Sequence, residues 1–64
     1  MDSKEIDHAM RYRLPVMYEG KRYDRIAEYI SYYDEHGKRH LSAVLLQGRT
    51  AYRVPAEKVK EVER

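Results

Sequence analysis

The sequence predicts a single, mostly β domain of 64 residues, built as a small barrel or a curved antiparallel sheet with one short helical turn. Three observations predict this class. Apolar and polar residues alternate in several short segments, glycine-containing turns separate these segments, and a proline follows the last clear strand. The length allows one domain only. We divide the chain into residues 1–11, a tail or short helix, and residues 12–64, the β-rich domain.

The first eleven residues carry a helix-start signal. Asp2 and Glu5 have the spacing of a capping box, and Ile6, Ala9 and Met10 follow at helical spacing. Because an isolated helix of this length is marginal in water, a frayed tail is the alternative. The segment is too polar for a signal peptide or a membrane span, so we expect a cytoplasmic protein that does not contact membranes.

Residues 12–18 are predicted to form the first strand, because Tyr12, Leu14, Val16 and Tyr18 alternate with other residues. Pro15 has no backbone N–H to donate, which predicts an edge strand. Glu19-Gly20-Lys21 then reads as a turn.

Residues 22–34 fit either a helix or a strand, since Tyr23, Ile26 and Ile30 satisfy both periods. The following residues favour the strand. A turn-forming segment around Gly37 separates it from the apolar run at 40–47, so two runs of similar length flank one loop. We predict an antiparallel hairpin here. A helix at 23–33, giving an α+β fold, is the alternative.

The last third of the chain reads as a turn at Gly48-Arg49, a strand at 50–54, and a helical turn that Pro55 begins. Val59 and Val62 follow at helical spacing. The predicted core combines the inward residues of these strands: Leu14, Val16, Ile26, Ile30, Leu41, Val44, Leu46, Tyr52, Val54 and Val59.

This order of strands and turns resembles the SH3-like small barrel. The segment 52–62 (YRVPAEKVKEV) is similar to the end of an SH3 domain, where a proline-led turn precedes a valine that closes the barrel. No ALYDY-type segment or tryptophan pair accompanies it, so the resemblance implies no polyproline ligand. The pattern V-x-Y-x-G-K-x-Y at 16–23 also resembles short uncharacterised proteins of Gram-positive phages and mobile elements.

Nothing in the sequence indicates an enzyme or a bound cofactor. The chain has no cysteine, no glycine-rich phosphate loop and no triad pattern, and a domain this small rarely encloses a substrate pocket, so we expect no small-molecule substrate. His36 and His40 have a spacing found in metal sites, but Gly37 lies between them in a predicted turn and no third ligand is fixed. We interpret them as residues of a solvated hairpin tip.

Arginine and lysine alternate with tyrosine at three places, and this is the candidate binding surface. Its residues are Arg11, Tyr12, Arg13, Lys21, Arg22, Tyr23, Arg25 and Arg53. Small barrels bind nucleic acid with such residues, by phosphate contacts and base stacking. The alternative is that the tyrosines pack inward beneath the arginine stems. The net charge of only +2 favours the second interpretation.

We therefore predict a non-enzymatic accessory module that docks on a protein partner or on itself, by strand addition at the Pro15 edge or by burial of exposed tyrosines. A nucleic-acid-binding small barrel that uses the arginine and tyrosine cluster is the alternative.

Overall fold

Strands form most of the regular structure, which confirms the predicted mostly β class. The computed structural model describes residues 1–62. The elements in chain order are α1 (Ser3–Arg11), β1 (Val16–Tyr18), β2 (Lys21–Tyr23), β3 (Arg25–Tyr33), β4 (Arg39–Gln47), β5 (Thr50–Pro55), the 3-10 turn η1 (Ala56–Lys58) and β6 (Lys60–Glu61).

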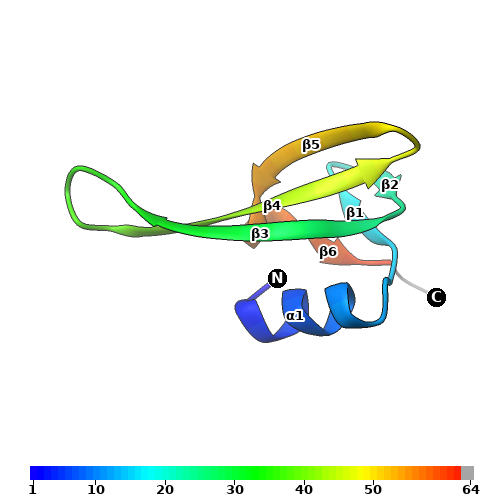
Figure 1. Ribbon diagram of the computed structural model, residues 1–64, viewed down its shortest axis with the longest axis horizontal. Coiled ribbons are helices and arrows are strands. Elements are labelled where there is room, and N and C mark those ends of the chain that lie inside the picture. Colours follow the sequence, from blue (N-terminus) through cyan, green and yellow to red (C-terminus); the bar gives the residue numbers. More distant parts are fainter. Residues whose placement is uncertain (63–64) are drawn as a thin grey trace.

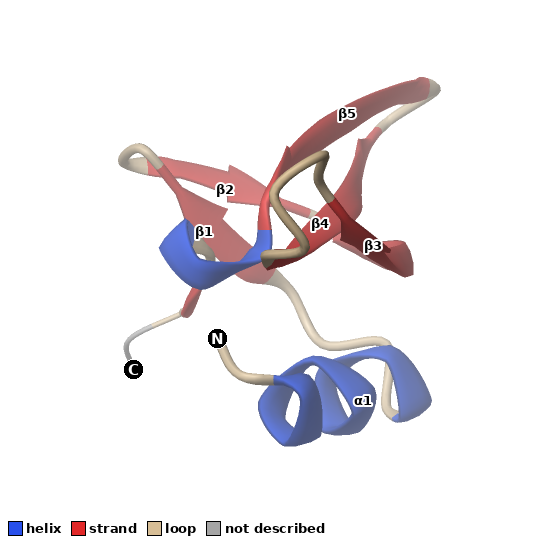
Figure 2. Cartoon of the chain, turned by 90° about the vertical axis from the view of Figure 1, so that its left-hand side faces the viewer, coloured by secondary structure: helices blue, strands red, loops and turns tan. Residues whose placement is uncertain are grey.

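The six strands of residues 1–62 form two antiparallel sheets of three strands each. Sheet A has the order β2-β1-β6, and sheet B has the order β3-β4-β5. Only Asp24 separates β2 from β3, so one bent stretch of chain passes from sheet A into sheet B. Figure 2 shows the sheets beside each other with α1 below them. The arrangement is a small barrel-like domain with one short helix.

The core lies where the inner faces of both sheets meet α1. Its buried apolar residues are Ile6, Ala9, Val16, Tyr23, Ile26, Ala43, Leu45, Val54, Ala56 and Val59. Four of the predicted core residues are thus buried, namely Val16, Ile26, Val54 and Val59, and Leu14 and Leu41 pack against them from partly buried positions.

Two of the three predicted core positions on β4, Val44 and Leu46, were wrong by one residue. Leu45 is fully buried and pairs with Ile26, whereas its neighbours Val44 and Leu46 are half-buried on the opposite face. Alternate residues of a strand face opposite sides, so one shift exchanges the two sets. Ile30 belongs to the half-buried set, and the predicted core residue Tyr52 is exposed.

Helix α1 begins with the predicted capping box, since Asp2 accepts the Glu5 backbone N–H and the Glu5 side chain accepts that of Asp2. Ile6 and Ala9 are its buried residues. The Met1 ammonium group donates to the backbone carbonyls of Ala56 (3.1 Å) and Val59 (2.8 Å). These contacts attach the helix start to η1, far along the chain.

The β1–β2 hairpin turns at Glu19 and Gly20, whose φ angles are 50° and 76°. Positive φ at both central residues defines a type I′ turn, which matches the twist of the two strands. The turn predicted at these residues is therefore confirmed.

The predicted edge position of the first strand was wrong. Strand β1 begins only at Val16 and lies between β2 and β6. Residues 12–15 instead lead out of α1, with Arg13 at a φ of 52°. Pro15 precedes the strand, where its missing N–H removes no ladder hydrogen bond. Strand addition at this position is excluded, because β1 has a neighbour on each side.

Strands β3 and β4 form the predicted hairpin around Gly37, with Tyr33 opposite Arg39. A bulge between Ile26 and Glu28 shifts the register near the start of β3. The tip of this hairpin projects well beyond α1 and β5 (Figure 1), so the molecule is elongated, measuring 37 × 23 × 20 Å. We call residues 29–42 the hairpin arm.

Candidate interaction surface

The outer face of sheet B, which points away from the core, carries an apolar stripe. Ile30, Val44 and Leu46 lie on it half-buried, each on the side of its strand opposite the core residues. Within residues 1–62, α1 and sheet A lie on the other side of sheet B, and no helix or strand lies over the stripe. The stripe is therefore open to a partner.

Three side chains from three strands extend this outer face toward the arm. The Tyr32 and His40 rings stack, with centroids 5.2 Å apart and planes at 21°. The guanidinium carbon of Arg53 lies 5.7 Å from the centre of the Tyr32 ring. Cation–π attraction of this kind stabilises an exposed pair by about 0.5–1 kcal/mol. The stack fixes Tyr32 although its ring is partly open to water.

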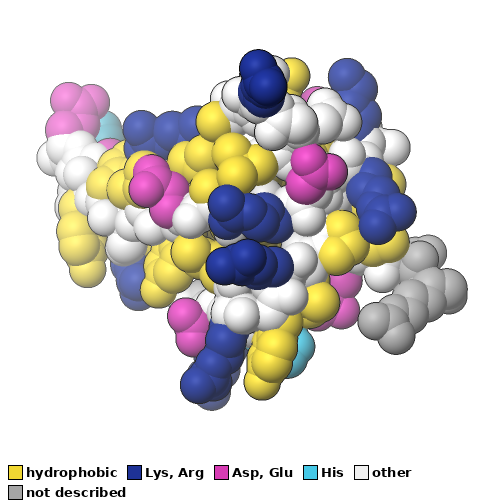
Figure 3. Space-filling model, turned by 45° about the vertical axis from the view of Figure 1, so that its right-hand side comes forward, with side chains coloured by type: hydrophobic (Ala, Val, Ile, Leu, Met, Phe, Trp, Pro, Cys, Tyr) yellow, Lys and Arg dark blue, Asp and Glu magenta, His cyan; other side chains and the backbone are white. Residues whose placement is uncertain are grey.

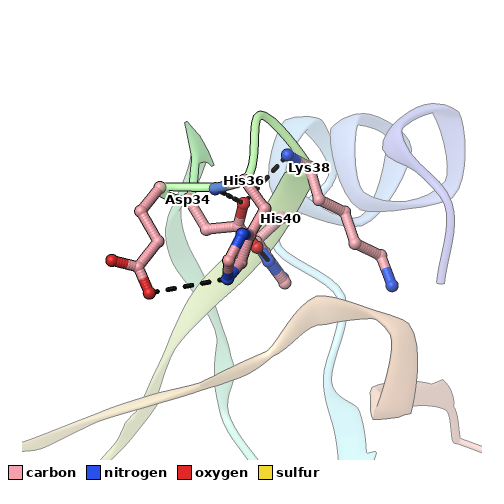
Figure 4. A network of polar contacts seen from close by, with 5 residues as sticks. Asp34, His36, Lys38 and His40 are labelled. Carbon is pink, nitrogen blue, oxygen red and sulfur yellow. Dashed lines mark hydrogen bonds and ion pairs between the residues drawn. The ribbon is translucent and has the colours of Figure 1, made fainter.

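Asp34 organises the end of the arm (Figure 4). One of its carboxylate oxygens accepts the backbone N–H groups of His36 and Lys38, both at 2.9 Å, and the other lies 2.7 Å from Nε2 of His40. The hydrogen bond with His40 and those from the backbone lower the pKa of Asp34. An ionised Asp34 thus connects the loop to the stack of Tyr32 and His40.

A pocket of about 370 Å³ lies where β4 continues past the end of β5. Its lining includes Tyr32, His40, Ser42, Pro55 and Glu57. The pocket lies between the outer face of the arm and η1, so it offers a partner a concave surface beside the apolar stripe.

The predicted arginine and tyrosine cluster is divided among several parts of the structure. Tyr23 is buried in the core, and its ring lies edge-to-face with the ring of Tyr52, with centroids 5.6 Å apart. Tyr12 is exposed at the end of α1 and lies against His8. The predicted cations are all exposed: Arg11, Arg13, Lys21, Arg22, Arg25 and Arg53. Arg22 faces the helix end across a pocket that His8 and Leu14 also line.

The basic side chains are scattered. On the face shown in Figure 3, Lys and Arg side chains stand in separate groups between apolar and acidic ones. In residues 1–62, the two ion pairs both join a histidine to a carboxylate, at His40–Asp34 and at His36–Glu35. No arginine among residues 1–62 therefore lies within ion-pair distance of a carboxylate of those same residues.

Sequence reasoning missed the aromatic stack and the Asp34 network. It placed His36 and His40 at a solvated tip, but His40 is half-buried and paired with Asp34. The described chain contains no group of three or more residues that would hold a metal ion. The signal that could have found the network is the hairpin register. It places His40 opposite Tyr32, two residues before Asp34 on the neighbouring strand.

The chain has no match among protein-family models, curated proteins or solved structures. Within the described residues, no helix has the length and apolar character needed to cross a membrane.

Proposed function

We propose that this protein is a non-enzymatic interaction module that docks on a protein partner or on a second copy through the outer face of sheet B. The observation that carries the proposal is the half-buried apolar stripe of Ile30, Val44 and Leu46 on the face of sheet B opposite the core. A partner that covers these side chains removes apolar area from water, and complete burial of one such side chain is worth about 1.5–3 kcal/mol.

The surroundings of the stripe support a protein partner. Protein interfaces combine a central apolar patch with tyrosine and arginine, and Tyr32 and Arg53 lie on the same face as the stripe. The fixed stack presents Tyr32 with little remaining freedom, which reduces the entropy lost on binding.

Site-specific crosslinking tests the proposal. A benzophenone amino acid in place of Val44 should form discrete adducts with protein chains in an extract of the source cells. The same group in place of Lys60, an exposed residue of β6, is the matched control and should form none of them. Equal adducts from both positions would contradict the proposal, and so would adducts to nucleic acid alone.

The second candidate function is nucleic-acid binding, which the exposed arginines and the contact of Arg53 with Tyr32 favour. Retention on single-stranded DNA that falls steeply with salt would support it. Replacement of Arg13 and Arg22 by Ala should then weaken binding to all sequences equally, since phosphate contacts carry no base information. We expect little retention.

We further propose that the domain is an SH3-like barrel of a phage or mobile-element protein that acts in the cytoplasm. Support for the barrel comes from η1, which separates β5 from the short β6, and from the buried Val59 that follows it. Support for the origin is the pattern of Val16, Tyr18, Gly20, Lys21 and Tyr23 alone.

A further inference from the structure

The free edge of β3 carries a row of backbone groups that the fold does not use. The backbone N–H of Asp34 donates to the carbonyl of Lys38, so it points toward β4. Backbone direction alternates along a strand, so the N–H and C=O groups of Tyr29, Ser31 and Tyr33 point away from β4. Strand β3 is an edge of sheet B, and the arm projects beyond α1 (Figure 1). These groups can therefore pair with another strand.

Residues 29–33 of this edge lack the features that protect natural edge strands. Natural sheets block their edges with charged residues, proline, bulges or very short strands. Strand β3 has nine residues, and its bulge and its charged residues, Arg25 and Glu28, all lie before Tyr29. Three of the five exposed large apolar residues in residues 1–62 lie on it: Tyr29, Tyr32 and Tyr33. The opposite edge, β5, ends in Pro55.

We propose that β3 pairs antiparallel with β3 of a second copy, on a two-fold axis at Ser31. This inference goes beyond the proposed function, because it uses the edge of sheet B rather than its outer face. The register places Tyr29 opposite Tyr33 of the second copy and Ser31 opposite Ser31. The residues whose backbone N–H and C=O groups point away from β4 therefore pair with the same residues of the second copy. Aromatic cross-strand pairs stabilise a sheet, and a symmetric dimer needs such a self-complementary patch.

The residue at the two-fold axis is small enough for two copies to meet there, on the face that carries Tyr29 and Tyr33. Ser31 meets Ser31 of the second copy, and its small side chain leaves room there, with its hydroxyl oxygen accepting from Nε of Arg39 at 2.8 Å. On the outer face, Ile30 lies opposite Tyr32 of the second copy. The two stripes then become continuous across a six-stranded sheet.

Charge limits the length of the pairing. In this register Glu28 lies opposite Asp34 of the second copy, and like charges directly opposite destabilise a strand pair. The pairing therefore covers residues 29–33 and is weak. A heterologous strand would meet no such symmetric constraint, whereas this register makes a specific prediction for Glu28.

The oligomeric state tests the inference, by light scattering and sedimentation of the purified chain from about 10 µM to 1 mM, the range of weak complexes. The mass of the wild-type chain should rise toward twice the monomer mass. Ser31→Pro removes an outward N–H that the ladder does not use, and it should weaken the dimer at least about tenfold while the fold is kept. Ser31→Ala is the matched control, and it should dimerise.

Glu28→Lys tests the register, because it places opposite charges at both ends of the pairing. The dimer should tighten by about fivefold, as two cross-strand charge pairs change sign. Glu28→Gln should have a smaller effect in the same direction. A dimer that Glu28→Lys leaves unchanged or weakens would contradict the axis at Ser31.

A wild-type chain that stays monomeric throughout would overturn the inference, and so would a folded Ser31→Pro dimer of unchanged affinity. If Ser31→Pro does not fold, Tyr33→Lys decides: a folded monomer supports the inference and a dimer of unchanged affinity overturns it. Crosslinking from position 44 reports on the outer face rather than on the edge. A chain that stays monomeric but still forms adducts from position 44 would thus contradict the pairing of β3 with a second copy and leave the proposed function standing.

Discussion

The two halves of the β3–β4 hairpin are made of similar residues but are held in different ways. In the half near sheet A, Ile26 and Leu45 are fully buried, with Val54 beside them on the inner face. In the projecting half, Tyr33 is 70% exposed and Tyr32 is 42% exposed. Burial stabilises the first half, while side-chain contacts on one face, from Arg53 through Tyr32 and His40 to Asp34, hold the second.

The difference shows why apolar and aromatic content alone does not locate a core. Tyrosine can close a core, as Tyr23 does, or it can form an exposed row, as on the arm. What separates the two cases is whether another layer covers the face. A hairpin whose outer half has no second layer is suited to contacts with other molecules, at the expense of its own stability.

The largest expected difference in stability is between substitutions at two neighbouring residues, Leu45 and Val44, which lie on opposite faces of β4. Leu45→Ala should lower the free energy of unfolding by about 2–5 kcal/mol, because it leaves a cavity between the layers. Val44→Ala should cost less than about 1 kcal/mol, since its side chain lies on the outer face and is only partly buried. Urea unfolding followed by circular dichroism measures both. Similar losses would mean that the outer face is a core.

Two glycines with the same backbone angle allow a sharper comparison, since Gly20 and Gly37 both have a φ of 76°. An added Cβ meets no atom within 4 Å at either site, so alanine introduces backbone strain alone. Gly20→Ala should cost about 1–2 kcal/mol of global stability.

Gly37→Ala should lower global stability less, because the arm can open while the core stays folded. Its effect should be concentrated in the amide exchange of residues 32–40. Equal shifts of the unfolding midpoint for both variants would show that the arm unfolds together with the core.

The smallest expected effect is the loss of order in the arm when acid protonates Asp34. Its pKa is lowered in the folded chain, mainly by the hydrogen bond with His40. A lowered pKa contributes stability that is present above the unfolded value of about 3.9 and is lost as pH falls through the folded value. Acid should therefore release the arm first, seen as changed NMR shifts of Tyr32 and His40 below about pH 4.

Asp34→Asn is the control for this acid transition. It keeps an acceptor oxygen for the loop but removes the titrating group, so the transition in Tyr32 should disappear. A transition of unchanged size in the variant would assign it to other carboxylates.

Much of the fold is readable from the sequence because its signals are local. The capping box at Asp2 and Glu5, the Glu19-Gly20 turn and the loop at Gly37 each depend on a few adjacent residues, and each forms as predicted. A strand was correctly preferred over a helix for residues 25–33, because the hairpin partner lies directly behind the loop. The prediction was wrong for Arg22 and Tyr23, which belong to β2 and pair with β1, since the chain bends at Asp24 into the other sheet.

The sequence does not settle which face of β4 is buried. Apart from Ser42, the run Leu41 to Leu46 is apolar in both alternating sets, so period two gives little preference between Leu45 and Val44. The bulge after Ile26 and the position of α1 decide it, and both are tertiary features. Pro15 misled for the same reason, since the turn that follows α1 places it ahead of β1.

The candidate site was harder to predict than the fold. The cluster at residues 11–25 is contiguous in sequence, but β2 directs Tyr23 inward and leaves Arg22 outside. Arg53 joins Tyr32 and His40 only because β5 pairs beside β4, a contact between residues far apart in the chain. Crosslinking from position 44 distinguishes binding through the outer face from binding through the cluster.

Amide hydrogen exchange of the dilute monomer tests most directly the claim that a buried half and a projecting half coexist in one hairpin. Amides of Ala43 and Leu45, which point toward β5, should exchange only through global unfolding. Those of Tyr32 and His40 should exchange through local opening, with clearly lower protection. The outward N–H groups of Ser31 and Tyr33 should exchange fastest. Uniform protection along both strands would contradict the account, because the arm would then be as firmly held as the core.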